Sequence, residues 1–233
     1  NGCFQGIMQA NLVIEDLDKL SASQFGFSDA EFNNLKAQNR VLRAWFYLRL
    51  LDAFRHVPFA TSYYDLSKNI QTQVPPKQIY DFIESELKNA IPLLAKKTTL
   101  GGNQNHQGSW TQAAAAALLV RLYLNAKVYI GEDHYNDCAT VAQAILNGTY
   151  GTYQIGSRWD EAFDWNNQTS DEVIFAFPGS EGYSHWHYGG DMYWWSVPSK
   201  ANEWLKDTKN KQGSHNIKYS ASPSLRPNGT AYT

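Results

Sequence analysis

The sequence predicts a mainly α-helical protein, built from tetratricopeptide-like helical hairpins with a loop-rich, aromatic-rich region docked on them. Two observations support this fold class. Apolar residues recur at helical spacing through most of the first 150 residues. After residue 150 this periodicity disappears, and glycine, asparagine, serine, tryptophan and tyrosine become frequent. We therefore predict a helical scaffold over residues 1–150 and an irregular region over 151–233 that packs on it within one structural unit.

The first two helices are predicted over residues 4–17 and 29–54, where apolar side chains follow the helical period. The second is apolar on more than one face, which is typical of a helix buried between neighbours. Arg49 and Asp52 on it have the i,i+3 spacing of an ion pair. The helix should end before Pro58, because the residue preceding a proline avoids the helical conformation.

Three more helices complete the predicted scaffold. Pro75-Pro76 opens one that breaks down at Pro92, since proline suits a first helical turn and not an interior. Ser109 or Thr111 caps the next, over 112–130, which Gly131 ends. The last covers 135–147. Its predicted inward side chains are Cys138, Ala139, Val141, Ala142, Ile145 and Leu146.

The last two helices form a hairpin with alanine-rich contacts, which is the design of a tetratricopeptide pair, although no regular repeat of about 34 residues is present. Outside the helices, residues 96–108 are polar and glycine-rich and predict a loop. Residues 172–178 predict a short strand, and a short helix is expected near 200–206.

Composition excludes several classes of protein. Lys and Arg number 20 against 22 Asp and Glu, with no dense basic run, which argues against a nucleic-acid binder. No apolar run approaches the roughly 20 residues that span a bilayer. Cys3 and Cys138 make at most one disulfide and no metal framework. Because the last residues, 221–233, close on no helix or strand signal, we expect the chain to belong to something longer.

Several segments, in their order along the chain, resemble the SusD-like family of Bacteroidetes outer-membrane glycan-binding lipoproteins. The segments are QNRVLRAWFYLRLLDAFRHVPF (38–59), IYDFIESELKNAIPLL (79–94), WTQAAAAALLVRLYLNA (110–126) followed by AQAILNGTYGTY (142–153), and WDEAFDWNNQTSDEVIFAF (159–177). Each alone is ordinary, but four in this order are specific, and the resemblance extends over roughly residues 1–177.

The resemblance implies a tetratricopeptide-like scaffold in a chain about twice this length. It also implies a lipid-anchored protein at the cell surface, which captures glycan for a SusC-like TonB-dependent transporter. The lipidated cysteine of the family should lie upstream of this segment, because Cys3 falls inside a helical pattern. One departure is Arg55-His56, where the family commonly has an aromatic or small residue and glycine.

The stretch WHYGGDMYWW, residues 186–195, combines five aromatic rings with a Gly-Gly turn. Sugars present an apolar C–H face to flat rings and a hydroxyl rim to polar side chains, so such a stretch on a loop favours a glycan site. Burying one ring stabilises a fold by up to about 4–6 kcal/mol, so part of the group should be core. The predicted ligand-binding residues are Trp186, Tyr188, Asp191, Tyr193, Trp194, Trp195 and Asn202.

Three functions are compatible with these patterns. The first, which we favour, is non-catalytic glycan binding without cofactor or metal. The second is a helical glycoside hydrolase, for which Asp160, Glu161 and Asp164 are the carboxylates to consider, although surface or capping roles suit them better. The third is a tetratricopeptide-type scaffold for protein interactions, in which the aromatic residues of 183–195 are mostly buried. The pair His185 and His187 has no third metal ligand in view.

Overall fold

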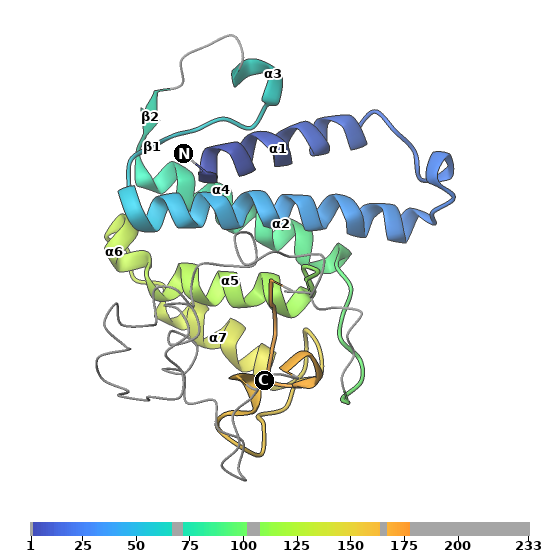
Figure 1. Cartoon of the computed structure of the whole chain (residues 1–233). Helices are drawn as coiled ribbons and strands as arrows, with labels where there is room; N and C mark the ends of the chain where they lie inside the picture. The colour runs from blue at the N-terminus through green and yellow to red at the C-terminus, as the bar shows by residue number, and fades with distance from the viewer. Residues whose placement is uncertain (1, 67–71, 102–107, 164–166, 178–233) are drawn as a thin grey trace, which may run out of the picture. The chain divides into compact units, whose positions relative to one another are not determined.

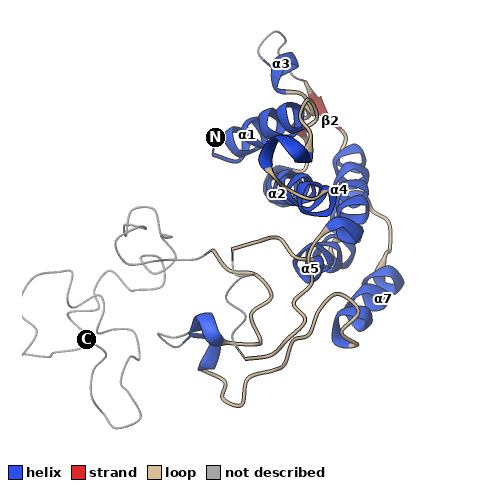
Figure 2. Cartoon of the chain, turned by 90° about the vertical axis from the view of Figure 1, so that its right-hand side faces the viewer, coloured by secondary structure: helices blue, strands red, loops and turns tan. Residues whose placement is uncertain are grey.

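A computed structural model describes residues 2–66, 72–101, 108–163 and 167–177. The chain divides into two units, Asn1–Ala176 and Phe177–Thr233, and the described fold is that of the first. It is mainly helical, as predicted, and its longer helices stack in chain order, which is clearest when they are viewed nearly end-on (Figures 1 and 2). The predicted division at residue 150 stays a prediction, since residues 178–233 lie outside the described part.

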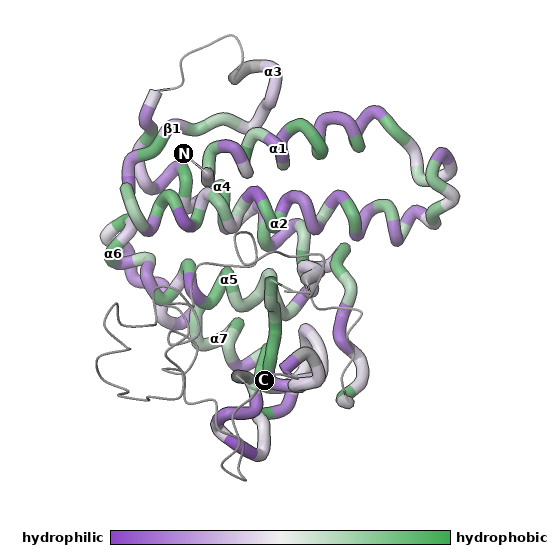
Figure 3. The backbone as a smooth tube through the Cα atoms, in the orientation of Figure 1, coloured by the Kyte–Doolittle hydropathy of each residue, from purple (hydrophilic) through white to green (hydrophobic). Residues whose placement is uncertain are grey.

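The first helical pair confirms the predicted helices. α1 (Gly2–Leu17) lies along α2 (Asp29–Phe54), and α2 also packs against α4 (Pro76–Ala90) and α5 (Gln112–Leu124). A Cβ added to Gly6 of α1 would overlap the ring of Phe46, so the glycine lets that ring lie against the α1 backbone. Hydropathy alternates along α2 (Figure 3), as expected of a helix enclosed by neighbours and wetted along part of its length.

Capping explains where α2 begins and ends. Ser28 and Glu31 form a capping box, in which Ser28 N donates to Glu31 Oε2 at 2.8 Å. Arg55 follows the last turn with φ 62°, a region that residues with a side chain rarely adopt. Its guanidinium donates to the carbonyls of Leu51 (2.7 Å) and Asp52 (2.6 Å), so the side chain caps the helix that its own backbone ends. Arg55 and His56, where the sequence departs from the family pattern, thus follow the last turn of α2 and mark its end.

Two short strands follow, which the sequence did not predict. β1 (Val57–Pro58) and β2 (Gln73–Val74) pair antiparallel, with Val57 opposite Val74. The short helix α3 (Tyr63–Leu66) lies between them in sequence. Tyr47 of α2 fixes the segment between β1 and α3, because its hydroxyl donates to Ala60 O at 2.7 Å and accepts from Ala60 N at 2.9 Å.

α4 begins at Pro76 and gives way to a 3-10 turn over Ile91–Leu93, as Pro92 predicted. Thr111 caps α5, where its Oγ1 accepts from Ala114 N at 3.2 Å. The predicted single helix over 112–130 is wrong, however. It breaks at Asn125 (φ −99°, ψ 3°), whose side-chain amide donates to Arg121 O at 2.8 Å, and α6 (Ala126–Ile130) then ends at the left-handed Gly131.

The last described helix is α7 (Tyr135–Leu146), which packs chiefly on α5. Cys138 and Val141 pack against the core, as predicted, whereas Ala139 and Leu146 are exposed, so their predicted inward position is wrong. Ala139 and Leu146 are seven residues apart and therefore share one face of α7, and this face points away from α5. Cys3 and Cys138 are both free thiols.

Residues 172–177, predicted as a strand, form no ladder in the described part of the chain. The segment is held on the core by side chains instead. The ring of Phe175 stacks on Trp110, which precedes α5, with centroids 4.0 Å apart, and just before the segment Asp171 Oδ1 lies 2.6 Å from Lys97 Nζ. None of the helices described here is long and apolar enough to cross a bilayer.

Candidate ligand-binding surfaces

The predicted glycan site lies outside the described residues, and its assignment stays a prediction. This applies to the whole set: Trp186, Tyr188, Asp191, Tyr193, Trp194, Trp195 and Asn202. The candidate surfaces that the structure describes are therefore on the helical unit. They are an exposed indole on the loop after α7 and a small pocket between α2 and α5.

Most rings of the described part that lie near α2 serve the core. Trp110 is 8% exposed and is packed between Phe175 and Trp45, whose centroid lies 6.4 Å away. Tyr47 contacts Phe82 edge-on, with centroids 5.4 Å apart. These rings stabilise the contacts between helices and leave no open face for a ligand.

Trp159 is different, because 86% of its surface is exposed. Its loop is fixed by two carboxylates that accept backbone N–H groups. Gly156 N donates to Glu172 Oε2 at 3.1 Å, and Ser157 N donates to Glu161 Oε2 at 3.0 Å. Trp159 is therefore an exposed indole on a loop that is fixed by hydrogen bonds, and such a ring can stack against the apolar face of a sugar.

The carboxylates near Trp159 have structural partners. Asp160 Oδ1 lies 2.9 Å from Arg158 Nε, and the pKa of Asp160 is held below its usual value, first by this hydrogen bond. Glu161 caps the turn described above, which confirms its predicted capping role. Asp164 lies outside the described residues. Within the described part, no group of three His, Cys, Asp or Glu side chains could hold a metal ion.

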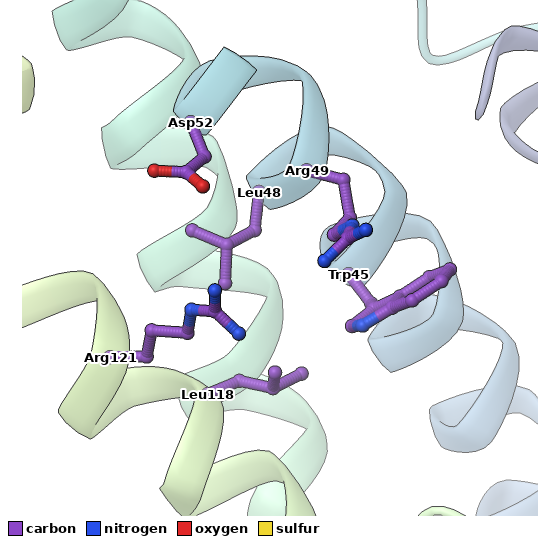
Figure 4. A pocket seen from close by; sticks show the side chains of 6 residues that line it. All are labelled: Trp45, Leu48, Arg49, Asp52, Leu118 and Arg121. Carbon is purple, nitrogen blue, oxygen red and sulfur yellow. The ribbon is translucent and has the colours of Figure 1, made fainter. Parts of the chain in front are cut away.

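The pocket between α2 and α5 is small, and six side chains line it (Figure 4). They are Trp45, Leu48, Arg49, Asp52, Leu118 and Arg121. Arg121 extends from α5 toward α2, while Arg49 folds back along α2 on the Trp45 side (Figure 4). Two guanidinium groups thus line a space whose other walls are largely apolar.

The predicted ion pair between Arg49 and Asp52 is wrong. The guanidinium of Arg49 lies over the Trp45 ring, 5.8 Å from its centroid, and the carboxylate of Asp52 points away from it (Figure 4). Asp52 instead accepts a hydrogen bond of 2.9 Å from the hydroxyl of Tyr129 on α6. Burial raises the pKa of Tyr129 to about 12, with this hydrogen bond contributing. Arg49 thus contacts Trp45, and Asp52 bonds to Tyr129, which explains why their spacing in sequence predicted an ion pair that does not form.

The comparisons with known proteins agree with this fold. Residues 1–124 match the SusD-like family model described as "Starch-binding associating with outer membrane". The chain belongs to the SusD-like family.

Relatives with known names extend the match. The chain is similar to the starch-binding protein SusD of Bacteroides thetaiotaomicron, with 28% identity over 173 residues, or 72% of this chain and 29% of SusD. It is similar in structure to a laminarin-binding SusD-like protein, with a TM-score of 0.66 and 25% identity over 80% of this chain and 39% of the other.

A SusD superfamily protein of Parabacteroides distasonis has a TM-score of 0.67 at 22% identity over 78% of this chain, which supports the fold alone. The chain spans between 29% and 39% of the length of these relatives. The SusD-like match therefore identifies the helical part of a family whose members are longer.

Proposed function

We propose that this chain is part of a non-catalytic glycan-binding protein of the cell surface. The observation that carries the proposal is the family match over residues 1–124 together with the shared fold of the laminarin-binding relative. In this proposal the protein captures polysaccharide or oligosaccharide for a SusC-like TonB-dependent transporter. It is held at the outer membrane by a lipid anchor in the full-length protein.

Stacking on aromatic rings supplies the binding in this proposal. The predicted residues of 186–202 remain its first site, with Trp194 and Trp195 as the central rings. Trp159 adds an open indole on a loop that is already ordered, so stacking there costs little conformational entropy. Two or three stacked rings with hydrogen bonds correspond to affinities of about micromolar to millimolar, typical of a capture protein that must release its ligand.

The test is affinity gel electrophoresis of the chain against starch-type, plant, laminarin and host polysaccharides. Two variants remove rings, Trp194→Ala/Trp195→Ala and Trp159→Ala. Tyr135→Ala is the matched control, because Tyr135 is also exposed, on α7. We expect one polysaccharide class to retard the chain and one ring variant to lose retardation while the control keeps it.

Two results would contradict the proposal. If no polysaccharide retards the folded chain, glycan binding is wrong and a scaffold for protein interactions takes its place. If the incubated polysaccharide gains new reducing ends, the protein is a hydrolase and the non-catalytic assignment is wrong.

A further inference from the structure

The two arginines of the pocket between α2 and α5 differ from Arg43 of α2 and Arg55 at its C-terminal end. Arg43 is buried and bonded to Glu86, and Arg55 caps the helix end. Arg49, by contrast, contacts the Trp45 ring, and no carboxylate within the described residues lies in ion-pair distance of Arg49 or Arg121. Two cations on facing helices therefore share one pocket, and neither forms an ion pair with a carboxylate that the structure describes.

The only acidic side chain that lines the pocket does not neutralise them. Asp52 is turned away from Arg49 and accepts the hydroxyl of Tyr129. The pocket therefore carries a positive balance of two guanidinium groups to one carboxylate. Leu48 and Leu118 line the same pocket, and apolar walls strengthen the attraction of an anion by lowering the local dielectric constant.

The geometry suits a planar oxyanion group. A guanidinium presents a fork of N–H donors in its plane, which matches the two oxygens of a carboxylate. The guanidinium of Arg49 lies over the Trp45 ring, 5.8 Å from its centroid, and this cation–π contact favours its position at the pocket. Trp45 itself is no stacking platform, since Arg49 covers it and both Phe46 and Trp110 contact it. The pocket has room for one small group and not for a sugar ring.

We propose that Arg49 and Arg121 bind the carboxylate of an acidic sugar within a glycan ligand. The inference rests on the proposed glycan-binding function, and it adds uronate-containing glycans as the substrate class of this surface. The sugar ring lies outside the pocket, and its carboxylate enters between the two guanidinium groups. Attraction between exposed charges weakens with salt, so this contact should weaken as ionic strength rises.

The experiment is a titration of the isotope-labelled chain followed by NMR, reading the side-chain Nε–H signals of Arg49, Arg121 and Trp45. The probes are trigalacturonate, the neutral maltotriose, sodium acetate and an oligoglutamate peptide. Arg121→Gln removes one guanidinium of the pocket. Arg40→Gln is the matched control, because Arg40 lies on α2 outside the pocket and loses the same charge.

We expect trigalacturonate to shift the pocket signals with a dissociation constant of about a millimolar or below, and maltotriose to leave them in place. Arg121→Gln should weaken this binding by about tenfold, the effect of losing a charge-assisted hydrogen bond, while Arg40→Gln leaves it unchanged. Added salt should weaken trigalacturonate binding.

Three results would overturn the inference. If trigalacturonate shifts none of the pocket signals, the pocket does not bind the carboxylate of an acidic sugar. Equal shifts with acetate at the same concentration show that the pocket takes an adventitious anion only. Stronger binding of oligoglutamate assigns the pocket to an acidic protein partner. Retardation of the chain by polysaccharides is measured separately, so if it persists in the first case, this inference fails while the proposed function stands.

Discussion

Replacing Arg43 by methionine should destabilise the protein more than any other single change of a charged residue on α2. Arg43 is 6% exposed and donates to groups in three separate segments. Its Nε and Nη2 groups donate to Glu86 Oε2 of α4 at 3.1 and 2.5 Å, and Nη1 donates to Asn11 Oδ1 of α1 at 2.8 Å. Nη1 also donates to the carbonyl of Thr61 at 3.4 Å. One side chain thus joins α1, α2, α4 and the loop before α3.

The magnitude follows from what the substitution leaves behind. Methionine fills most of the space but donates nothing, so the carboxylate of Glu86, 14% exposed, is left buried and unpaired. Asn11, which is fully buried, loses the donor to its side-chain oxygen. Breaking a buried ion pair from one side costs about 3–5 kcal/mol, a large part of the roughly 5–15 kcal/mol that holds a typical domain folded.

Urea denaturation followed by circular dichroism measures this loss. Lys19→Met is the control, because its ion pair with Asp16 at 3.0 Å is exposed on both sides and should contribute no more than about 1 kcal/mol. The double variant Arg43→Met/Glu86→Met should be more stable than Arg43→Met alone, since it removes the stranded charge. The reasoning is refuted if Arg43→Met costs no more than Lys19→Met, or if the effects of the two buried substitutions simply add.

Three further substitutions test packing and capping by the same measurement. Trp110→Ala should cost about 3–5 kcal/mol, because it opens a cavity beneath the stacked Phe175; retention of full stability would contradict the role of that stack. Thr111→Ala should cost about 1 kcal/mol through the lost N-cap, and Thr111→Ser should restore most of it. Gly6→Ala should cost about 1–3 kcal/mol by overlap with Phe46, and a gain in stability, as helix propensity alone predicts, would disprove the close packing.

The helices could be predicted because periodicity and caps gave the same answer. Pro76 and Thr111 each mark a terminus by a fixed dihedral or a local hydrogen bond, so the sequence holds the information. The capping box of Ser28 and Glu31 is a further local signal, which the prediction did not use. The break at Asn125 was missed because an Asn within a helical run can face solvent or bond its own backbone, and the periodic pattern is the same in both cases.

The prediction of strands was wrong because composition alone does not distinguish a strand from another partly buried segment. The apolar run at 172–178 has β-type composition, but β propensity describes a half-buried surface more than a backbone preference. Ile174 and Phe175 satisfy that description by packing on helices, without a ladder. The true strands, β1 and β2, have two residues each and are too short for any alternation to show.

The pocket could not be predicted from spacing. Arg49 and Arg121 belong to helices far apart in sequence, and their meeting depends on how α2 and α5 are rotated about their axes. The one local signal available, the i,i+3 spacing to Asp52, pointed to the wrong partner because Tyr129 arrives from a third helix. Residues of 186–202 were chosen by composition and stay predictions.

Because α7 packs chiefly on one side, we expect it to unfold locally before the other long helices do. A helix supported chiefly by one neighbour has a smaller free energy of local unfolding than helices enclosed by several, so its amides should exchange with solvent before those of α2 or α4. Cys138 lies on its inner face, with its thiol 3.5 Å from Val120 O. Cys138 is partly buried when α7 is docked, and it becomes fully exposed when α7 detaches. Its rate of reaction with a thiol reagent should therefore report the local unfolding of α7.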